Sequence, residues 1–151
     1  MNPEALKNGH ITYTTVIELT GNGSVMKRDE TSHCGECKVG TDEEGRIVCV
    51  VFEDAAGTEE SENNAVSNTL RIHEDRRVSF VRNGPISSEF IFDPENTTTA
   101  RVDTPYGSME LELATRRAEI VSGPSGTDIF IEYVFREAPF DRHTITLRIG
   151  F

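Results

Sequence analysis

Apolar residues alternate with polar ones over most of this chain, with a period of two residues. In segment 143–151, apolar residues fill every second position from Ile145 to Phe151, and Thr, Arg and Gly lie between them. A period of two is typical of an antiparallel strand with one buried face. The pattern recurs in segments 11–19, 66–74, 78–80, 86–92, 100–104, 109–113 and 129–135, and segment 47–52 is apolar at nearly every position. The chain is therefore predicted to form about eight to ten short strands, with little helix.

Turn-forming residues separate the predicted strands at short intervals. The clearest hairpin follows Asp103 and contains Pro105, Tyr106 and Gly107. Proline presets φ for the first corner of a turn, and glycine tolerates the conformation at its exit. We expect these four residues to form a structural turn, with the Tyr106 ring covering one end of the fold. Short strands joined by hairpins are typical of a meandering sandwich or barrel, and closure into a barrel removes exposed strand edges.

The length of 151 residues fits one domain. We expect a single domain over 1–151, with residues 1–9 flexible and residues 54–64 forming an acidic mobile loop. The formal charge of −11 disfavours a nucleic-acid partner, because neutralising phosphates requires clustered Lys and Arg. The acidic stretches 42–44 and 54–62 are interpreted as solvated loops, with a docking surface for a basic partner or for cations as the alternative.

Three features indicate where the protein resides. No segment approaches the ~18 consecutive apolar residues of a membrane span. The N-terminal residues lack the basic start and apolar stretch of a secretory signal, and three cysteines without such a signal indicate a reducing compartment. We expect a cytoplasmic protein, monomeric or homodimeric, with neither nucleic acid nor a membrane as a partner.

Several segments of the C-terminal part share a recognisable pattern. They are NTLRI (68–72), the F-x-R-x-G pattern in SFVRNG (79–84), DTPYGSMELELAT (103–115), IFIEY (129–133) and HTITLRI (143–149). Through them, residues 66–151 resemble the YwiB-like group, small bacterial proteins of unknown function with a calycin-like barrel. The resemblance implies an all-β fold: a single calycin-like or lipocalin-like, antiparallel, up-and-down β-barrel. It implies no activity and no catalytic residues, and the segment HCGECKVG (33–40) lies outside the shared pattern.

The interior of such a barrel is the first candidate site. An eight-stranded barrel is filled by its own side chains or holds one small ligand. Arg82 and Arg101 each lie within a strand beside apolar neighbours, so an inward-facing arginine would need an anionic partner such as Asp103 or a ligand carboxylate. The alternative is that both arginines face outward and pair with Glu110 or Glu112. The candidate ligand-binding residues are Arg82, Arg101, Phe80, Phe90, Met109 and Tyr133.

The segment around Cys34 and Cys37 is the second candidate site. A C-x-x-C pair places two thiolates within reach of one Zn²⁺, and His33 or Cys49 would complete a tetrahedral site. A redox pair is a further alternative, although the sequence that follows predicts a turn and a strand rather than the activating helix of such sites. The remaining interpretation is that Cys34 and Cys37 are two cysteines of a hairpin loop that stay reduced in the cell and form no site. Cys49 lies in an apolar strand and is equally well interpreted as a small buried residue.

The sequence gives no support for catalysis. It contains no G-x-S-x-G element and no phosphate-binding glycine loop before a helix. The leading hypothesis is a non-catalytic binding module for a small apolar or carboxylate-bearing ligand. The alternatives are a protein-interaction or homo-oligomeric scaffold that uses the outer barrel surface or a sheet edge, and a zinc or thiol site at Cys34 and Cys37. No cofactor other than that zinc is indicated.

Overall fold

The computed structural model describes residues 6–21, 23–55 and 65–151, and these residues form ten strands and no helix. None of the described segments is therefore a helix long and apolar enough to cross a membrane. The strands are β1 (Lys7–Gly21), β2 (Ser24–Thr41), β3 (Ile47–Ala55), β4 (Ala65–Ile72), β5 (Val78–Asn83), β6 (Ser87–Phe92), β7 (Thr98–Thr104), β8 (Gly107–Gly123), β9 (Gly126–Phe135) and β10 (Ala138–Gly150).

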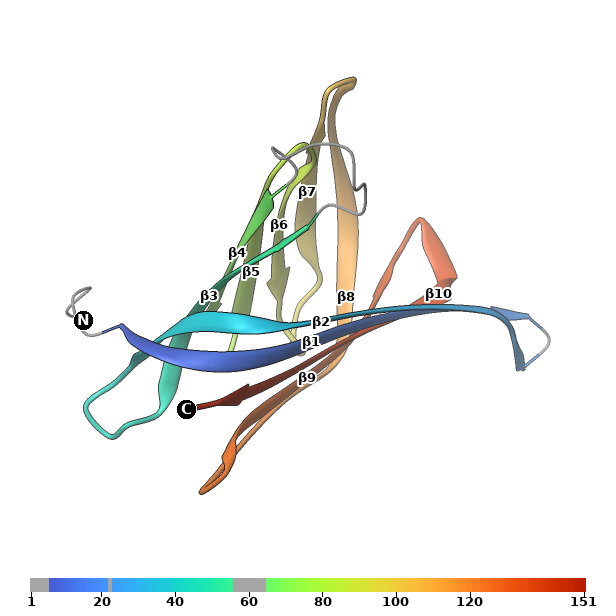
Figure 1. Ribbon diagram of the computed structural model, residues 1–151. Helices are drawn as coiled ribbons and strands as arrows, with labels where there is room; N and C mark the ends of the chain where they lie inside the picture. The colour runs from blue at the N-terminus through green and yellow to red at the C-terminus, as the bar shows by residue number, and fades with distance from the viewer. Residues whose placement is uncertain (1–5, 22, 56–64) are drawn as a thin grey trace.

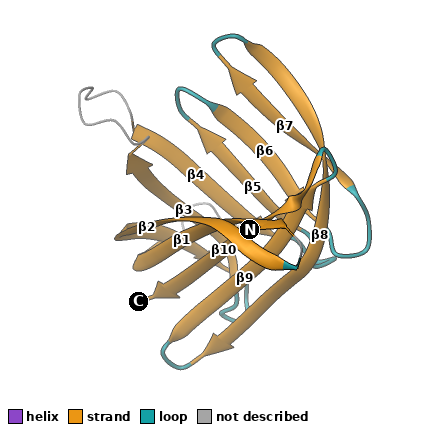
Figure 2. Cartoon of the chain, turned by 90° about the vertical axis from the view of Figure 1, so that its right-hand side faces the viewer, coloured by secondary structure: helices purple, strands orange, loops and turns teal. Residues whose placement is uncertain are grey.

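Each strand pairs antiparallel with its neighbours in the chain, and β1 also pairs with β10, which closes the barrel. The prediction of an all-β, up-and-down barrel is confirmed. Figure 1 shows the course of the strands, and Figure 2 shows β3 to β7 fanning out on one side, with β8 to β10, β1 and β2 on the other. The interior lies between these two groups of strands.

The core is built from alternate positions of the strands, as the period of two predicts. Leu70, Leu113, Ile131 and Leu147 are fully buried in it. The strand β3 has buried residues on both of its faces. Val50, on one face, belongs to the core; Cys49, on the other face, lies outside the core cluster but is only 4% exposed. The nearly continuous apolar run of this strand follows from that double burial.

The turn at Pro105 and Tyr106 joins β7 to β8 as a two-residue loop, with Thr104 paired to Gly107. The Thr104 hydroxyl donates to the Gly107 carbonyl at 2.9 Å and accepts from the Tyr106 amide at 3.1 Å. Gly107 has φ +134°, a conformation that favours glycine. Asp103 accepts hydrogen bonds from Ser108 and Arg101, and these bonds lower the pKa of its carboxyl group.

Two expectations about this hairpin are wrong. Tyr106 is fully exposed and covers nothing, and Met109 is 50% exposed instead of facing a packed interior. Both residues lie at the far end of β7 and β8, where none of the other described strands faces the hairpin (Figure 1). A residue near such a turn can therefore point to the inner face of its strand, as the alternation predicts, and still be exposed, because no strand lies opposite to cover it.

Two expectations concern the ends and the acidic loop. The sequence predicts flexibility over residues 1–9, whereas β1 begins at Lys7; residues 1–5 lie outside the described part of the chain. The sequence predicts an acidic loop over residues 54–64, whereas Asp54 belongs to β3; residues 56–64 also lie outside the described part of the chain.

The strand β2 is the largest element that the alternation does not predict. Its first nine residues, from Ser24 to Ser32, are all exposed, so they show no apolar face. This segment is a strand because its main chain pairs with β1 from Gly21 back to Thr14. The pairing of β2 with β3 covers only Cys37 to Thr41. Backbone hydrogen bonds to β1, rather than burial of side chains, therefore hold the first half of β2 in place.

Candidate functional site in the barrel interior

A cavity of about 180 Å³ opens from the barrel interior between β1, β5, β6, β9 and β10. Its wall is largely apolar and includes a few polar groups. The lining residues are Tyr13, Thr15, Val16, Ile17, Phe80, Arg82, Ser88, Phe90, Tyr133, His143, Thr144 and Ile145. A cavity of this size has room for about six water molecules, or for a small organic molecule in their place.

Several of the residues that line the cavity are aromatic rings packed against one another. Tyr13 stacks on Phe80 with ring centroids 5.9 Å apart, and Tyr133 stacks on His143 at 4.9 Å. Phe90 meets the edge of Tyr133 at 6.0 Å. Such pairs hold their members in fixed orientations, because offset and edge-on geometries are favoured. The cavity is therefore largely preformed.

Arg82 supplies the cation of the cavity. Its side chain, on β5, is 34% exposed and lies beside Asp54 of β3, with Nη2 3.4 Å from the carboxylate. This distance exceeds the roughly 2.7–2.9 Å of a well-formed bond between charged groups. The Nε atom of Arg82 is buried and finds no acceptor among the described residues. Arg82 thus keeps donors that a further anion could use.

A buried amide lies next to Arg82. Asn68 of β4 is opposite Arg82 in the strand register and is fully buried. Its Nδ2 atom donates to the carbonyls of Phe52 and Val66, both at 3.4 Å, whereas Oδ1 has no donor within the described part of the chain. Buried polar atoms without partners are costly, so a group of them in one place is typical of a functional site.

Burial fixes the protonation of the other polar groups. Burial raises the pKa of Tyr13 to about 12, with Arg82 opposing the rise and Asp54 adding to it. Burial likewise raises the pKa of Tyr133 and lowers that of His143, whose shift Asp141 opposes. At neutral pH both phenols are therefore protonated donors and the imidazole is uncharged. Arg82 is the positive charge of the cavity wall.

The structure gathers four of the predicted ligand-binding residues and separates the other two. Phe80, Arg82, Phe90 and Tyr133 all line the cavity. Arg101 does not: its side chain is 60% exposed and forms an ion pair with Asp103 at 3.2 Å. The preceding residue of the strand, Ala100, is fully buried. Because successive residues of a strand point to opposite faces, Arg101 faces outward. The outward alternative holds for Arg101, although its carboxylate is Asp103 rather than Glu110 or Glu112.

Sequence reasoning missed Tyr13, Ile17 and His143 as cavity residues. Tyr13 and Ile17 belong to the predicted first strand, and His143 to the predicted last one. The pairing of β1 with β10, which sets Ile17 opposite His143, brings them together. No local pattern signals that contact, because more than a hundred residues separate the two strands.

A wider groove of about 700 Å³ lies where β2 separates from β3. It is lined by Asn8, Gly9, His10, Glu36, Cys37, Lys38, Val51, Phe52, Glu53 and Phe151. Most of these side chains are exposed, and Lys38 donates to Asn8 at 2.7 Å. The groove gathers no set of donors comparable to that around Arg82, so the interior cavity is the better candidate.

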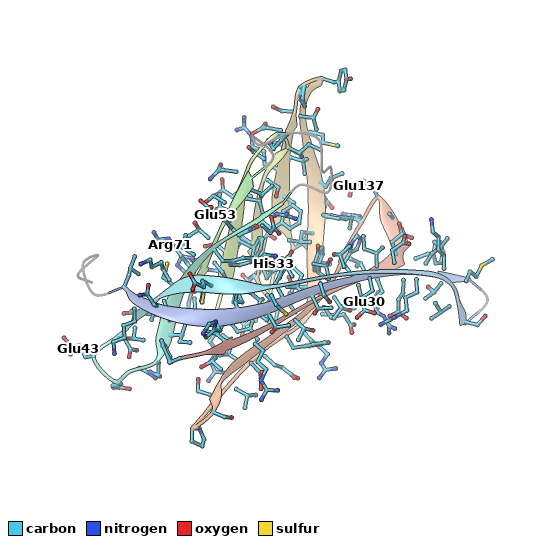
Figure 3. The ribbon with its side chains drawn as sticks, in the orientation of Figure 1. Glu30, His33, Glu43, Glu53, Arg71 and Glu137 are labelled. Carbon is cyan, nitrogen blue, oxygen red and sulfur yellow. The ribbon has the colours of Figure 1, made fainter. Side chains whose placement is uncertain are left out.

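The proposed zinc ligands do not come together. Cys34 is exposed and Cys37 is buried, because residues three apart on one continuous strand point to opposite faces. His33 stacks on Phe52, a core residue, with ring centroids 6.3 Å apart. Figure 3 shows His33 and Glu30 on opposite sides of the hairpin of β1 and β2. Cys49 lies outside the core cluster that contains Cys37. In the described part of the chain, no three His, Cys, Asp or Glu side chains are arranged to hold a metal.

We expect the three thiols to differ in reactivity. Burial raises the pKa of Cys37 and of Cys49, which lowers their thiolate fraction at neutral pH, whereas Cys34 is exposed. An aromatic disulfide reagent should therefore modify one thiol quickly in the folded protein and all three in guanidinium chloride. The variant Cys34→Ser should lose the fast phase. A fast phase of two thiols would contradict the separation of Cys34 from Cys37.

Comparison with known proteins gives a family and a fold. A family model described as a domain of unknown function, DUF1934, matches residues 11–149. The crystal structure of the ywiB protein from Bacillus subtilis is similar, with a TM-score of 0.69 and 17% sequence identity over 97% of this chain and 95% of that chain. No curated protein matches. At this identity the likeness to the solved structure concerns the fold alone.

Proposed function

Because this chain belongs to the family of the domain of unknown function DUF1934, whose description carries no activity, we propose a function from the barrel interior. The resemblance to the YwiB-like group is confirmed, and the match extends into the N-terminal half of the chain. The proposed function is non-catalytic binding of a small molecule that has one carboxylate and a short apolar body. The cytoplasmic location and the absence of nucleic-acid and membrane partners stay predictions from the sequence.

The observation that carries this proposal is the position of Arg82. Its guanidinium lies in the cavity wall with a buried Nε atom that has no acceptor among the described residues. A carboxylate binds a guanidinium through two parallel hydrogen bonds, and the buried Nε atom of Arg82 can take part in such a pair once the guanidinium shifts toward the ligand. The long contact to Asp54 leaves Arg82 able to shift toward a second anion.

The remaining lining sets the size and polarity of the ligand. Phe80, Phe90 and Ile145 offer apolar contacts, while the protonated hydroxyl groups of Tyr13 and Tyr133 can donate to a ligand oxygen. The volume of about 180 Å³ suits a short ligand better than a long acyl chain. A ring or a short alkyl chain bearing one carboxylate fits these requirements, because such sites combine apolar walls with few polar groups.

Titration with small acids tests this function. Benzoate and hexanoate should shift the amide NMR resonances of residues lining the cavity, whereas benzamide, which lacks the charge, should not bind measurably. The variant Arg82→Met should weaken binding of these acids by about 30-fold, the value of a lost hydrogen bond to a charged group. Arg101→Met is the matched control, because Arg101 lies outside the cavity and pairs with Asp103.

Equal binding of the acids by Arg82→Met and the wild type would disprove the role of Arg82. At an acid concentration of about 10 mM, even weak specific binding is detectable. If none of the acids binds at this concentration, the proposed function is disproved. Loss of binding in Arg101→Met but not in Arg82→Met would relocate the site to the outer surface.

A further inference from the structure

The first half of β2 is an unpaired sheet edge. From Ser24 to Glu36 this strand pairs with β1 alone, and no other described strand lies along its outer side. The free part spans thirteen residues, which is longer than a typical whole strand. Figure 1 shows β1 and β2 extending together beyond the strands β3 to β7. The hydrogen-bonding groups of this edge are open to another strand.

Natural proteins usually blunt such an edge. They use short strands, proline, bulges or lysine to prevent pairing with another chain. This edge is long and contains no proline; its bulge, between Val25 and Lys27, lies near the tip, and its one lysine, Lys27, is paired with Asp29. Its charges are of both signs rather than of one sign. An edge of this kind is open to a specific partner with complementary charges.

Four consecutive charged residues occupy the middle of the edge. Lys27 and Asp29 form an ion pair at 3.7 Å, and Arg28 and Glu30 form one at 3.0 Å. Residues two apart share a face of a strand, so the first pair lies on one face of the sheet and the second pair on the other. Each face of the edge therefore carries one cation and one anion.

We propose that the edge from Ser24 to Glu36 pairs, antiparallel, with the same edge of a second copy of this chain. A two-fold axis perpendicular to the sheet generates this arrangement and keeps the same face of both copies on one side. Residues directly opposite each other then lie on the same face. The axis consequently passes beside a residue, and the pairing of opposite charges places it at Arg28 or Asp29, so that residues 24–32 or 24–34 of the edge face the copy.

Both positions of the axis pair opposite charges. With the axis at Arg28, Lys27 lies opposite the partner's Asp29, and Asp29 lies opposite the partner's Lys27. When the axis passes beside Asp29, Arg28 lies opposite the partner's Glu30, and Glu30 lies opposite the partner's Arg28. Directly opposed charges of unlike sign stabilise a strand pair. One like pair lies at the axis in each case, and each member is flanked by an opposite charge of its own chain.

The order of the charges favours a second copy over another partner. Each face of the edge carries one cation and one anion two residues apart, Lys27 with Asp29 and Arg28 with Glu30. On the face away from the axis residue, a copy that runs the opposite way therefore presents an anion to each cation and a cation to each anion. A strand with charges of only one sign would place two like charges against this edge, and like charges directly opposite each other are destabilising.

Charge reversal tests the proposal in the full-length protein. The variant Lys27→Glu with Arg28→Glu makes the edge acidic, and the variant Asp29→Lys with Glu30→Lys makes it basic. We expect light scattering after size exclusion to show a dimer for the wild type. In each variant alone, the dissociation constant of the dimer should rise about tenfold or more. A mixture of the two variants should form a mixed dimer. The control variant Arg46→Glu with Arg77→Glu makes the same change of net charge as the acidic variant, at two turns outside this edge.

Each outcome of this experiment either supports or overturns the proposed pairing of the β2 edge. Restoration of a dimer by mixing the two variants supports pairing of this edge with itself, because neither variant can supply it alone. A wild-type protein that is monomeric at about 100 µM overturns the proposal. A dimer that both variants retain, or that the control variant also loses, overturns it too, since the contact would then lie elsewhere. Circular dichroism and thermal unfolding confirm that each variant is folded.

Discussion

Replacing Phe92 with alanine will lower the free energy of unfolding by about 3–5 kcal/mol, the cost of removing a buried aromatic side chain and leaving a cavity. Phe92 lies on β6 and is fully buried. Its ring centroid is 5.0 Å from that of Tyr133 and 6.1 Å from that of Phe90. Urea unfolding followed by circular dichroism will measure the change.

The same substitution at Phe140 is the control. Phe140 is 67% exposed, so Phe140→Ala should change the free energy of unfolding by no more than about 0.5 kcal/mol. Equal effects at the two positions would contradict the placement of Phe92 in the core. Because Tyr133 and Phe90 also line the cavity, Phe92→Ala should in addition weaken the binding of small acids, through loss of support behind these two rings.

Replacing Gly126 with alanine will lower the free energy of unfolding by about 2–4 kcal/mol, because two effects add. Gly126 has φ +139°, which side-chain-bearing residues rarely adopt. A Cβ atom there would also overlap the main-chain carbonyl oxygen of Ile149 on β10. That carbonyl belongs to a paired strand, so it cannot move aside without disturbing the pairing of β10 with β9.

Gly123 provides the matched control on the other side of the same hairpin. Gly123 pairs with Gly126, has no positive φ, and would place a Cβ atom in open space. Gly123→Ala should leave stability unchanged or raise it by about 0.4–1 kcal/mol, through the lower entropy of the unfolded chain. If Gly126→Ala is as stable as Gly123→Ala, the close approach of β10 at this point is wrong.

The proposed ligand site and the proposed dimer contact use different parts of the molecule. The ligand site depends on the interior side chains around Arg82, whereas the dimer contact depends on the main chain and the exposed charges of β2. The variant Arg82→Met should therefore remain dimeric. The charge-reversed variants should still bind small acids.

The two arginines show where prediction from the sequence stopped. Arg82 and Arg101 both lie within a strand and near apolar residues, so their local surroundings are alike. Arg82 lies two residues after the buried Phe80 and shares its face, whereas Arg101 directly follows the buried Ala100 and takes the opposite face. Which alternate set turns inward depends on the neighbouring strands. The same reasoning applies to Cys34 and Cys37, whose spacing fits a metal site in a turn and excludes one on a continuous strand.

The sequence by itself determined the all-β class, most of the strands and the hairpin at Pro105 and Tyr106, because alternate burial and turn geometry act between near neighbours in the chain. Only the tertiary structure decided that the polar segment from Ser24 to Glu36 is a strand, since β1 supplies its hydrogen bonds. It also decided which residues line the cavity, where Tyr13, Arg82 and His143 come from three strands that lie far apart in the sequence. Pairings between distant segments depend on register across the whole barrel, and no short stretch of sequence encodes that register.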